Sequence, residues 1–275
     1  MATASEITRQ AKSNLAFALK ILPREQQQDM LVFYAFCRTI DDLADDPSRP
    51  LAQRAELLNQ WRNGLLAGFA APDDFQKELL ALRDRQRLPN ELLVAIIEGC
   101  QMDLLPQRFP TWGDLSSYID KVACAVGLIS IRLFGCQDPA SERYAIALGH
   151  ALQLTNILRD IGEDLSNGTR LYLPLEDLAR FGLTEGELVA RVADSRFLAL
   201  MEHLAARAEH FFIEAENSLP VRDLQALRPA RIMGEIYQLL LGKMRADHFQ
   251  VFTRRYRVSK PQKILILSKH LIARN

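Results

Sequence analysis

Two short acidic segments constrain this chain more than any other feature of its sequence. In the downstream segment, Gln153, Asn156, Asp160 and Asp164 follow one another at steps of three or four residues. Such steps place side chains on one face of an α-helix, and two carboxylates one turn apart can reach the same cation because a turn advances only about 5.4 Å. Apolar residues surround the stripe, and an acidic stripe in apolar surroundings repels itself without a positive charge nearby. The segment therefore predicts a helix that needs a partner helix or a metal ion.

The upstream segment repeats the pattern more than a hundred residues earlier. Tyr34, Arg38, Asp41 and Asp45 stand at the same helical steps, again among aliphatic and aromatic residues. Taken alone, either segment is also compatible with a solvated acidic helix face, because short motifs have many false matches. Two acidic pairs, each with an arginine on or beside its stripe, favour the hypothesis that two helices face each other across a shared site.

Beyond the spacing, these segments resemble a known family. Asp41-Asp-Leu-Ala-Asp45 and Asn156-Ile-Leu-Arg-Asp-Ile-Gly-Glu-Asp164 are similar to the acidic motifs of the squalene/phytoene synthase family, the head-to-head isoprenyl diphosphate synthases. Three further segments also resemble that family: the tyrosine-bearing stretch 118–127, the stretch 170–174 and the stretch 228–233. The resemblance implies an all-α, isoprenoid synthase-type helical bundle around a central apolar cavity.

Composition is consistent with one globular domain. The chain has 275 residues, 48% of them hydrophobic and only 13 of them glycine, so it can bury a large core within the usual size of a domain. Its 34 basic and 34 acidic residues give a formal net charge of zero, which argues against a nucleic-acid binder that relies on a general basic field. Without a linker or low-complexity stretch, we expect residues 1–275 to form a single all-α domain.

The cysteines and the N-terminus bear on the compartment. None of Cys37, Cys100, Cys124 and Cys136 belongs to a Cys-x-x-Cys pair, so we interpret them as reduced packing residues. The first ten residues lack an apolar signal core, and no apolar run is long enough to cross a membrane. We expect a cytoplasmic protein without a transmembrane segment. Peripheral contact with a membrane surface and the oligomeric state stay open.

Helical periodicity dominates the chain, and no convincing strand pattern is present. Prolines and capping residues divide it into predicted helices. The predicted helices cover 5–21, the acidic helix from Pro23 to Pro47, 51–66, 75–87, 89–105, Thr111 to Phe134, the second acidic helix from Asp138 onward, 175–181, 184–191, 195–218, a helix opening at Pro229 and a basic helix after Pro261. Thr111 is the expected N-cap of its helix, with Asp114 at the capping-box spacing.

The donor types suit magnesium. Carboxylates are hard oxygen ligands, so Asp41, Asp45, Asp160 and Asp164 fit Mg²⁺ better than softer metals. Mg²⁺ usually keeps water and substrate phosphate oxygens among its ligands, so an isoprenyl diphosphate is a suitable substrate. We predict these four aspartates and Asn156 as the metal site.

The family resemblance implies further roles. Arg38 and Arg159 would bind diphosphate oxygens, although neutralising the adjacent aspartates is the simpler interpretation of each. Tyr118 would stabilise a carbocation through its ring or relay a proton to the departed diphosphate, and a packing role remains the alternative. The other predicted substrate-binding residues are Gln153, Asn156, Tyr34, Tyr237 and Arg170, with Lys121, Arg254 and Arg255 as further basic residues that could close over phosphates.

The leading hypothesis is head-to-head condensation of two farnesyl diphosphates to presqualene diphosphate, because the Asn-Ile-Leu-Arg-Asp form and Lys121 resemble bacterial presqualene diphosphate and squalene synthases. Continuation to squalene would need NADPH, and no Gly-x-Gly-x-x-Gly fingerprint is present. The alternative is a phytoene synthase that uses two geranylgeranyl diphosphates, and a non-catalytic helical lipid-binding protein is a distant third. Where the family commonly has Ser-Phe, this chain has Asn14-Leu15. Leu19 and Leu31, where a pocket floor could set the tail length, are intermediate in size and are compatible with both C15 and C20 tails.

Overall fold

The computed structural model describes residues 21–166 and 170–272. Within these ranges the chain is helical and contains no strand, only an isolated bridge between Phe109 and Pro174. The elements are α3 (Arg24–Asp45), α4 (Leu51–Ala67), α5 (Asp74–Gln86), α6 (Asn90–Met102), α7 (Trp112–Ile119), the π-helix η2 (Asp120–Cys124), α8 (Ala125–Leu133), α9 (Ala140–Ser166), α10 (Leu175–Arg180), α11 (Glu185–Val189), α12 (Ser195–Ser218), the 3₁₀ turn η3 (Val221–Asp223), α13 (Arg228–Ala246) and α14 (Lys260–Ile272). The predicted all-α class is confirmed.

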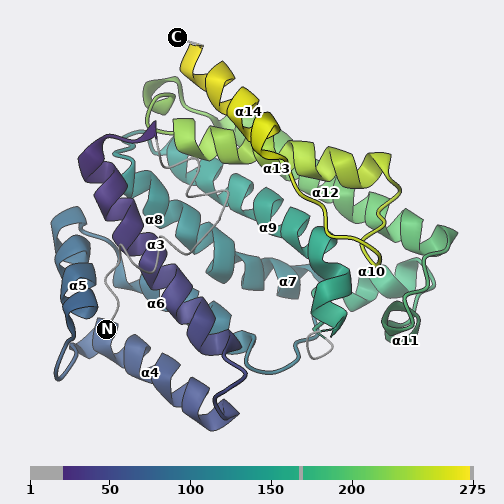
Figure 1. Cartoon of the computed structure of the whole chain (residues 1–275), viewed down its shortest axis with the longest axis horizontal. Helices are drawn as coiled ribbons and strands as arrows, with labels where there is room; N and C mark the ends of the chain where they lie inside the picture. Colours follow the sequence, from purple (N-terminus) through teal and green to yellow (C-terminus); the bar gives the residue numbers. More distant parts are fainter. Residues whose placement is uncertain (1–20, 167–169, 273–275) are drawn as a thin grey trace.

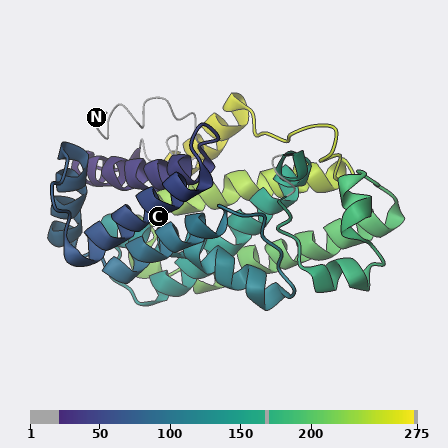
Figure 2. The same cartoon turned by 90° about the horizontal axis from the view of Figure 1, so that it is seen from below.

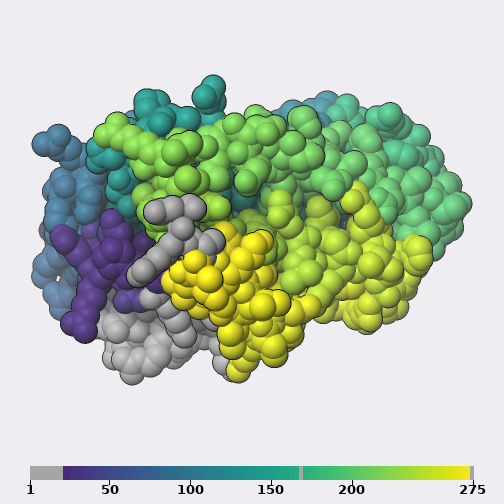
Figure 3. Space-filling model, turned by 90° about the horizontal axis from the view of Figure 1, so that it is seen from above, coloured from purple at the N-terminus to yellow at the C-terminus, as the bar shows by residue number. Residues whose placement is uncertain are grey.

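The helix α9 is the centre of the arrangement. It packs against α12 over most of its length and also contacts η2, α8, α13 and α7. The helices α3, α4 and α5 gather at one end of an elongated molecule, and α10 and α11 lie at the other (Figures 1 and 2). The helix α14 runs over the outer surface of α13 (Figure 3).

The apolar core has two clusters that meet at α8. One cluster surrounds α9, α12 and α13, and the other surrounds α3, α4, α5 and α6. Ile131 of α8 belongs to the first cluster, whereas Ile129 and Leu133 of the same helix belong to the second. Because α8 presents apolar side chains to both, the helices pack as neighbours around it. That all of residues 1–275 form one domain stays a prediction.

The helix boundaries lie within a few residues of the predicted ones, and local capping explains part of this agreement. The Thr111 hydroxyl accepts a hydrogen bond from the backbone N–H of Asp114 (3.2 Å), and the Asp114 carboxylate accepts one from the backbone N–H of Thr111 (2.9 Å). This capping box satisfies two N–H groups that the first helical turn leaves free. The predicted helix at 5–21, the Asn167-Gly168 turn, and Asn14, Leu15 and Leu19 fall almost wholly outside the described ranges.

One prediction needs a correction. The helix predicted from Thr111 to Phe134 is not a continuous α-helix, because the π-helix η2 separates α7 from α8. At this point the chain passes close to α9: a Cβ atom added to Gly149 would lie 3.0 Å from both Cα and Sγ of Cys124. A local change of helical register that accompanies such tertiary contact leaves no mark on hydrophobic periodicity.

Across the described residues, no helix has the length and apolar character that crossing a bilayer requires.

Candidate active site

Both acidic pairs lie at the C-terminal ends of their helices. Asp41 and Asp45 occupy the last turns of α3, and Asp160 and Asp164 lie near the end of α9. Neither helix has a basic residue in its last turn. The C-terminal end of a helix carries a partial negative charge, so carboxylates there are repelled by the helix as well as by one another. The arrangement favours a cation that comes from elsewhere in the chain or from solution.

Arg170 supplies part of that positive charge. Its Nη2 donates a hydrogen bond to Oδ1 of Asp45 (2.7 Å) and another to the backbone carbonyl of Asp103 (3.2 Å). The same guanidinium also lowers the pKa of Asp164, opposing the other influences on that group. Arg170 therefore lies between the upstream and downstream acidic segments and brings them into one site.

The carboxylates remain crowded in spite of Arg170. Desolvation and the neighbouring Asp45 raise the pKa of Asp41 to about 6, although 52% of its side-chain surface is exposed. Desolvation and Asp160 raise the pKa of Asp164 to about 7. The charge of Asp103 raises both of these pKa values. These raised pKa values mean that ionising the carboxyl groups of Asp41 and Asp164 costs free energy in the folded protein. A bound cation would lower that cost.

Asn156 presents an unpaired acceptor beside the carboxylates. Its Oδ1 is buried and has no hydrogen-bond partner among the described residues, while its Nδ2 donates a long hydrogen bond to Oε1 of Gln153 (3.4 Å). An unsatisfied buried acceptor is costly. One amide oxygen together with four carboxylates forms an all-oxygen donor set, which fits Mg²⁺.

Tyr118 and Tyr172 share one carboxylate. Tyr118 donates its phenolic O–H to Oδ2 of Asp103 (2.9 Å), and Tyr172 donates to Oδ1 of the same residue (2.7 Å). The two rings stack with centroids 5.4 Å apart. Tyr118 is 4% exposed, and burial raises its pKa further above the ordinary phenol value. Tyr118 is therefore a neutral hydrogen-bond donor and not a base.

The other predicted arginines form ion pairs with the acidic segments. Arg38 contacts Asp41 (3.1 Å) and Asp42 (2.5 Å). The Nε of Arg159 donates to the adjacent Asp160 (2.8 Å), and Arg255 reaches both Asp160 (3.2 Å) and Glu163 (2.9 Å). These guanidinium groups stand beside the carboxylates, where diphosphate oxygens could also reach them.

Lys121 and Arg254 pair with residues outside the two acidic segments. Lys121 binds Glu98 (2.7 Å), and Arg254 binds Asp247. Tyr34 is half-buried on α3, one turn before Arg38.

An apolar cavity of about 210 Å³ adjoins the polar site. Its walls come from η2, α8, α9 and α13, and Gln153, Asn156 and Tyr237 line the end closest to the acidic segment of α9. Along the rest of the cavity the lining residues are Val122, Ala123, Val126, Gly127, Ser130, Ile131, Phe134, Tyr144, Ala145, Leu148, Gly149, Leu152, Pro229, Ala230 and Met233. A charged head group bound at the aspartates would place its hydrocarbon tail in this cavity.

Comparison with known proteins identifies the family of the chain. The family model described as squalene/phytoene synthase matches residues 8–262 of the chain. The chain belongs to the squalene/phytoene synthase family. As a member of this family the protein is a prenyltransferase, of the type that joins two prenyl groups head to head.

Two relatives and two solved structures show what this squalene/phytoene synthase family member is similar to. The presqualene diphosphate synthase of Rhodopseudomonas palustris is 37% identical over 266 residues, which cover 94% of this chain and 93% of the relative. The 15-cis-phytoene synthase of a Synechocystis species is 34% identical over 276 residues, covering 95% and 81%. A solved dehydrosqualene synthase with bound ligand superposes with a TM-score of 0.81 at 31% identity, over 98% of this chain and 93% of that one. A squalene synthase from Alicyclobacillus acidocaldarius has a TM-score of 0.79 at 27% identity, over 90% and 93%.

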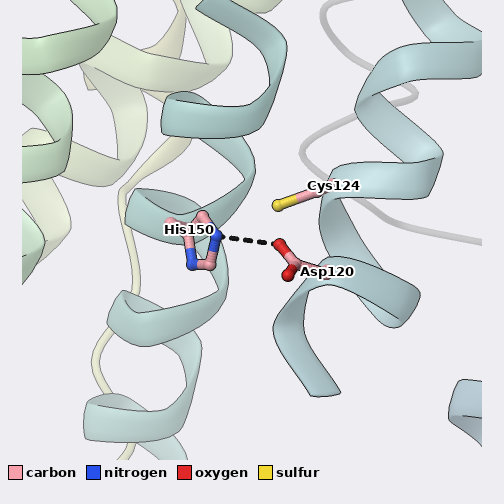
Figure 4. A group of neighbouring side chains, drawn as sticks. All are labelled: Asp120, Cys124 and His150. Atoms are coloured by element: carbon pink, nitrogen blue, oxygen red, sulfur yellow. Dashed lines mark hydrogen bonds and ion pairs between the residues drawn. The ribbon is translucent and has the colours of Figure 1, made fainter. Parts of the chain in front are cut away.

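A second cluster of residues whose types can bind a metal lies between η2 and α9, apart from the two acidic segments of this family member. Asp120, Cys124 and His150 place their ligand atoms within 4.8 Å of one another, and Nε2 of His150 lies 3.0 Å from Oδ1 of Asp120 (Figure 4). A metal-bound histidine usually donates its other ring N–H to an acceptor. The Nδ1 of His150 is buried without a partner among the described residues, so we assign the proton to Nε2, which donates it to Asp120. This pair ties η2 to α9.

Sequence reasoning missed two members of this squalene/phytoene synthase site. Asp103 follows the last residue of α6 and has no acidic neighbour at a helical step, so no stripe pointed to it. Tyr172 lies within the segment 170–174 that resembles the family, but no pattern in the sequence distinguishes it from a packing tyrosine. Their role becomes visible only when the fold brings them to Tyr118.

Proposed function

We propose that this prenyltransferase condenses two farnesyl diphosphates to presqualene diphosphate with the help of Mg²⁺. The observation that carries the proposal is the position of Arg170, which joins the two acidic segments beside an apolar cavity. The preference for farnesyl rests on presqualene diphosphate synthases that are 34% to 37% identical to the chain. Phytoene synthases at 34% and 33% keep geranylgeranyl diphosphate as the alternative substrate.

In the proposed site, Asp41, Asp45, Asp160, Asp164 and Asn156 would hold the metal. When bound, Mg²⁺ supplies positive charge that stabilises the departing diphosphate. Each aspartate pair contributes from a separate helix. The desolvation and the carboxylate repulsion that raise the pKa of Asp41 and Asp164 support the need for such a cation at this place.

The arginines would position the diphosphate. Arg38, Arg159 and Arg170 present planar donor groups that match phosphate oxygens. Each of them already contacts a carboxylate of the acidic segments, so a bound diphosphate would find donors of fixed orientation. Such preorganised donors are worth more than mobile ones, because they need no rearrangement when charge develops.

The reaction breaks one carbon–oxygen bond of the first substrate, forms two carbon–carbon bonds to the second, and releases one diphosphate and one proton. Tyr118 and Tyr172 would lie beside the developing allylic cation, where their stacked rings stabilise positive charge. The apolar cavity would keep water from the cation. A proton relay by Tyr118 to the departed diphosphate would require its O–H to leave Asp103.

Reduction of the product to squalene would need NADPH as the electron donor. A non-catalytic, lipid-binding role is disfavoured by the complete set of acidic and basic side chains around Arg170.

We also propose that the protein is cytoplasmic and that α14 contacts the surface of an anionic membrane. The helix exposes Ile264, Leu265, Leu271 and Ile272 to solvent, and Lys260 and Lys269 flank this apolar face. Exposed apolar residues between lysines are typical of helices that lie at a lipid interface. Sedimentation with vesicles of phosphatidylglycerol, but not of phosphatidylcholine, is the expected result, and failure to bind either would contradict this contact.

Product analysis tests the proposed reaction. Purified protein is incubated with Mg²⁺ and either farnesyl or geranylgeranyl diphosphate, with and without NADPH, and products are identified by mass spectrometry. We expect a C30 cyclopropyl diphosphate from farnesyl diphosphate. A C40 product formed only from geranylgeranyl diphosphate would overturn the farnesyl assignment, and a C30 hydrocarbon formed only with NADPH would extend the reaction to squalene.

A further inference from the structure

We propose that Phe134 is the residue that limits the length of the isoprenoid tail accepted by the cavity. This inference rests on the proposed function, since it assumes that the diphosphate binds at the aspartates and that the tail enters the cavity beside them. It adds a determinant of substrate length that neither acidic segment contains.

The cavity has a defined direction. Asn156 and Tyr237 lie at its polar end, and Phe134, Tyr144 and Pro229 lie at the other. Along α9, Asn156 and Tyr144 are 12 residues apart (156 − 144), which corresponds to about 18 Å because an α-helix rises about 1.5 Å per residue. A tail that starts near Asn156 therefore runs toward the side chains of Phe134 and Tyr144.

Phe134 separates the cavity from a further hollow. It lines the tail cavity and also a space of about 370 Å³ whose other walls are Ile21, Leu22, Pro23, Gln26, Gln225, Ala226, Arg228 and Pro229. Phe134 is 4% exposed and is one of two residues, with Pro229, that line both spaces, so we infer that its ring stands at the boundary between them. The backbone carbonyl of Phe134 accepts a hydrogen bond from Nε2 of Gln26 (3.1 Å), which holds the main chain in place when the ring is removed.

Tyr144 forms the other part of the end wall but leads to a different environment. It lines both the tail cavity and a pocket of about 320 Å³ that contains Arg231, Glu235 and Lys269. Glu235 and Lys269 form an ion pair of 2.9 Å there. Hydrocarbon in that pocket would remove water from charged groups, which is unfavourable. The space past Phe134 has one charged side chain in its lining, Arg228, against the four of the other pocket, so a longer tail is expected to extend there.

The experiment is a competition between farnesyl and geranylgeranyl diphosphate in the presence of Mg²⁺, with C30 and C40 products measured by mass spectrometry. We expect Phe134→Ala to raise the ratio of geranylgeranyl to farnesyl kcat/KM at least about tenfold, the size of effect that a few methylene contacts produce in an apolar pocket. Phe134→Leu, a milder change, should shift the ratio in the same direction by less.

Leu133→Ala and Tyr144→Ala are the comparison variants. Leu133 is the neighbouring buried residue, belongs to the α3 side of the core and does not line the cavity, so its truncation loses packing without lengthening the cavity. Tyr144→Ala enlarges the cavity toward the charged pocket. Both should keep the wild-type ratio, and thermal melting should show that Leu133→Ala and Phe134→Ala lose comparable stability.

The outcomes separate this inference from the proposed function. Suppose that the wild type converts farnesyl diphosphate and both Phe134 variants keep its substrate ratio. The assignment of Phe134 is then wrong and the proposed function stands. The same conclusion follows if Tyr144→Ala shifts the ratio and the Phe134 variants do not. A wild-type protein that converts neither substrate would refute both. A shift in Leu133→Ala equal to that in Phe134→Ala would attribute the effect to loosened packing and would also overturn the assignment.

Discussion

The guanidinium of Arg170 lies 2.7 Å from the carboxylate of Asp45, although the two residues are 125 positions apart in the sequence. Because the same group also bonds the Asp103 carbonyl and lowers the pKa of Asp164, it connects α3, the end of α6 and the end of α9. The site depends on this connection more than on any single helix.

Replacing Arg170 should therefore weaken catalysis far more than folding. We expect Arg170→Ala to lower kcat/KM by about 10²-fold or more, the usual cost of removing one preorganised donor from developing negative charge, and Arg170→Lys to recover part of the loss because it keeps the charge without the planar donors. Steady-state kinetics measure the effect. Arg49→Ala removes a comparable surface pair with Asp46 (2.8 Å) and should leave kcat/KM near that of the wild type; equal losses in the two variants would contradict the role of Arg170.

Neutralising a crowded aspartate should affect stability in two opposite ways. Without metal, Asp164→Asn should raise the melting temperature, because the ionised carboxylate is held against desolvation and against Asp160. With Mg²⁺ and diphosphate, the same variant should gain less stabilisation than the wild type, because it has lost a ligand. Differential scanning fluorimetry under both conditions measures these changes, and a variant that is less stable without metal would show that the site contains no such repulsion.

A single substitution tests the role of the Tyr118 hydroxyl separately from that of its ring. If the O–H takes part in proton transfer, Tyr118→Phe should lower kcat by about 10²-fold or more, whereas a role confined to the ring predicts little change. We expect the loss, because the buried hydroxyl can turn from Asp103, which it bonds at 2.9 Å, to the departed diphosphate and pass a proton to it. Tyr172→Phe removes the other phenol bound to the same carboxylate (2.7 Å) and serves as the matched comparison; equal kcat values for wild type and Tyr118→Phe would exclude the proton relay.

His150 should make the protein sensitive to mild acid. Burial lowers the pKa of His150, with Asp120 and Glu214 opposing the shift. The unfolded chain takes up a proton near pH 6.5, while folded His150 stays neutral until a lower pH, so the unfolded state binds more protons as pH falls. The part of the free energy of unfolding that depends on neutral His150 is then lost as pH falls below about 6.5. His150→Gln should show a flatter decline between pH 7 and pH 5 in urea melts, and an unchanged slope would contradict a neutral, buried imidazole.

Much of this fold could be predicted from sequence, because its signals are local. Prolines and capping residues such as Thr111 mark helix ends, and α12 begins and ends where its pattern does. The stripe of Asp160 and Asp164 on α9 is likewise a local periodicity. Family resemblance then supplied the pairing of distant helices, which spacing alone leaves open.

The unpredicted parts depend on tertiary contact. Asp103 became important because the fold places Tyr118, Tyr172 and Arg170 around it, and no local pattern encodes that convergence. The π-helix η2 accompanies close packing of Cys124 against Gly149. A similar limit applies to Phe134, which looks like an ordinary core residue until the cavities on either side of it are seen.

The central claim is that both acidic segments hold magnesium together with one diphosphate. Titration calorimetry with a non-reactive thio-diphosphate analogue of farnesyl diphosphate tests it most directly, using the wild type, Asp41→Asn and Asp160→Asn, each with Mg²⁺ and with a chelator. We predict tight binding only for the wild type with Mg²⁺, and binding weakened at least about tenfold, or about 1.4 kcal/mol, when either segment is altered. Binding by the wild type that is the same with chelator, or by either variant as tight as by the wild type, would contradict the claim.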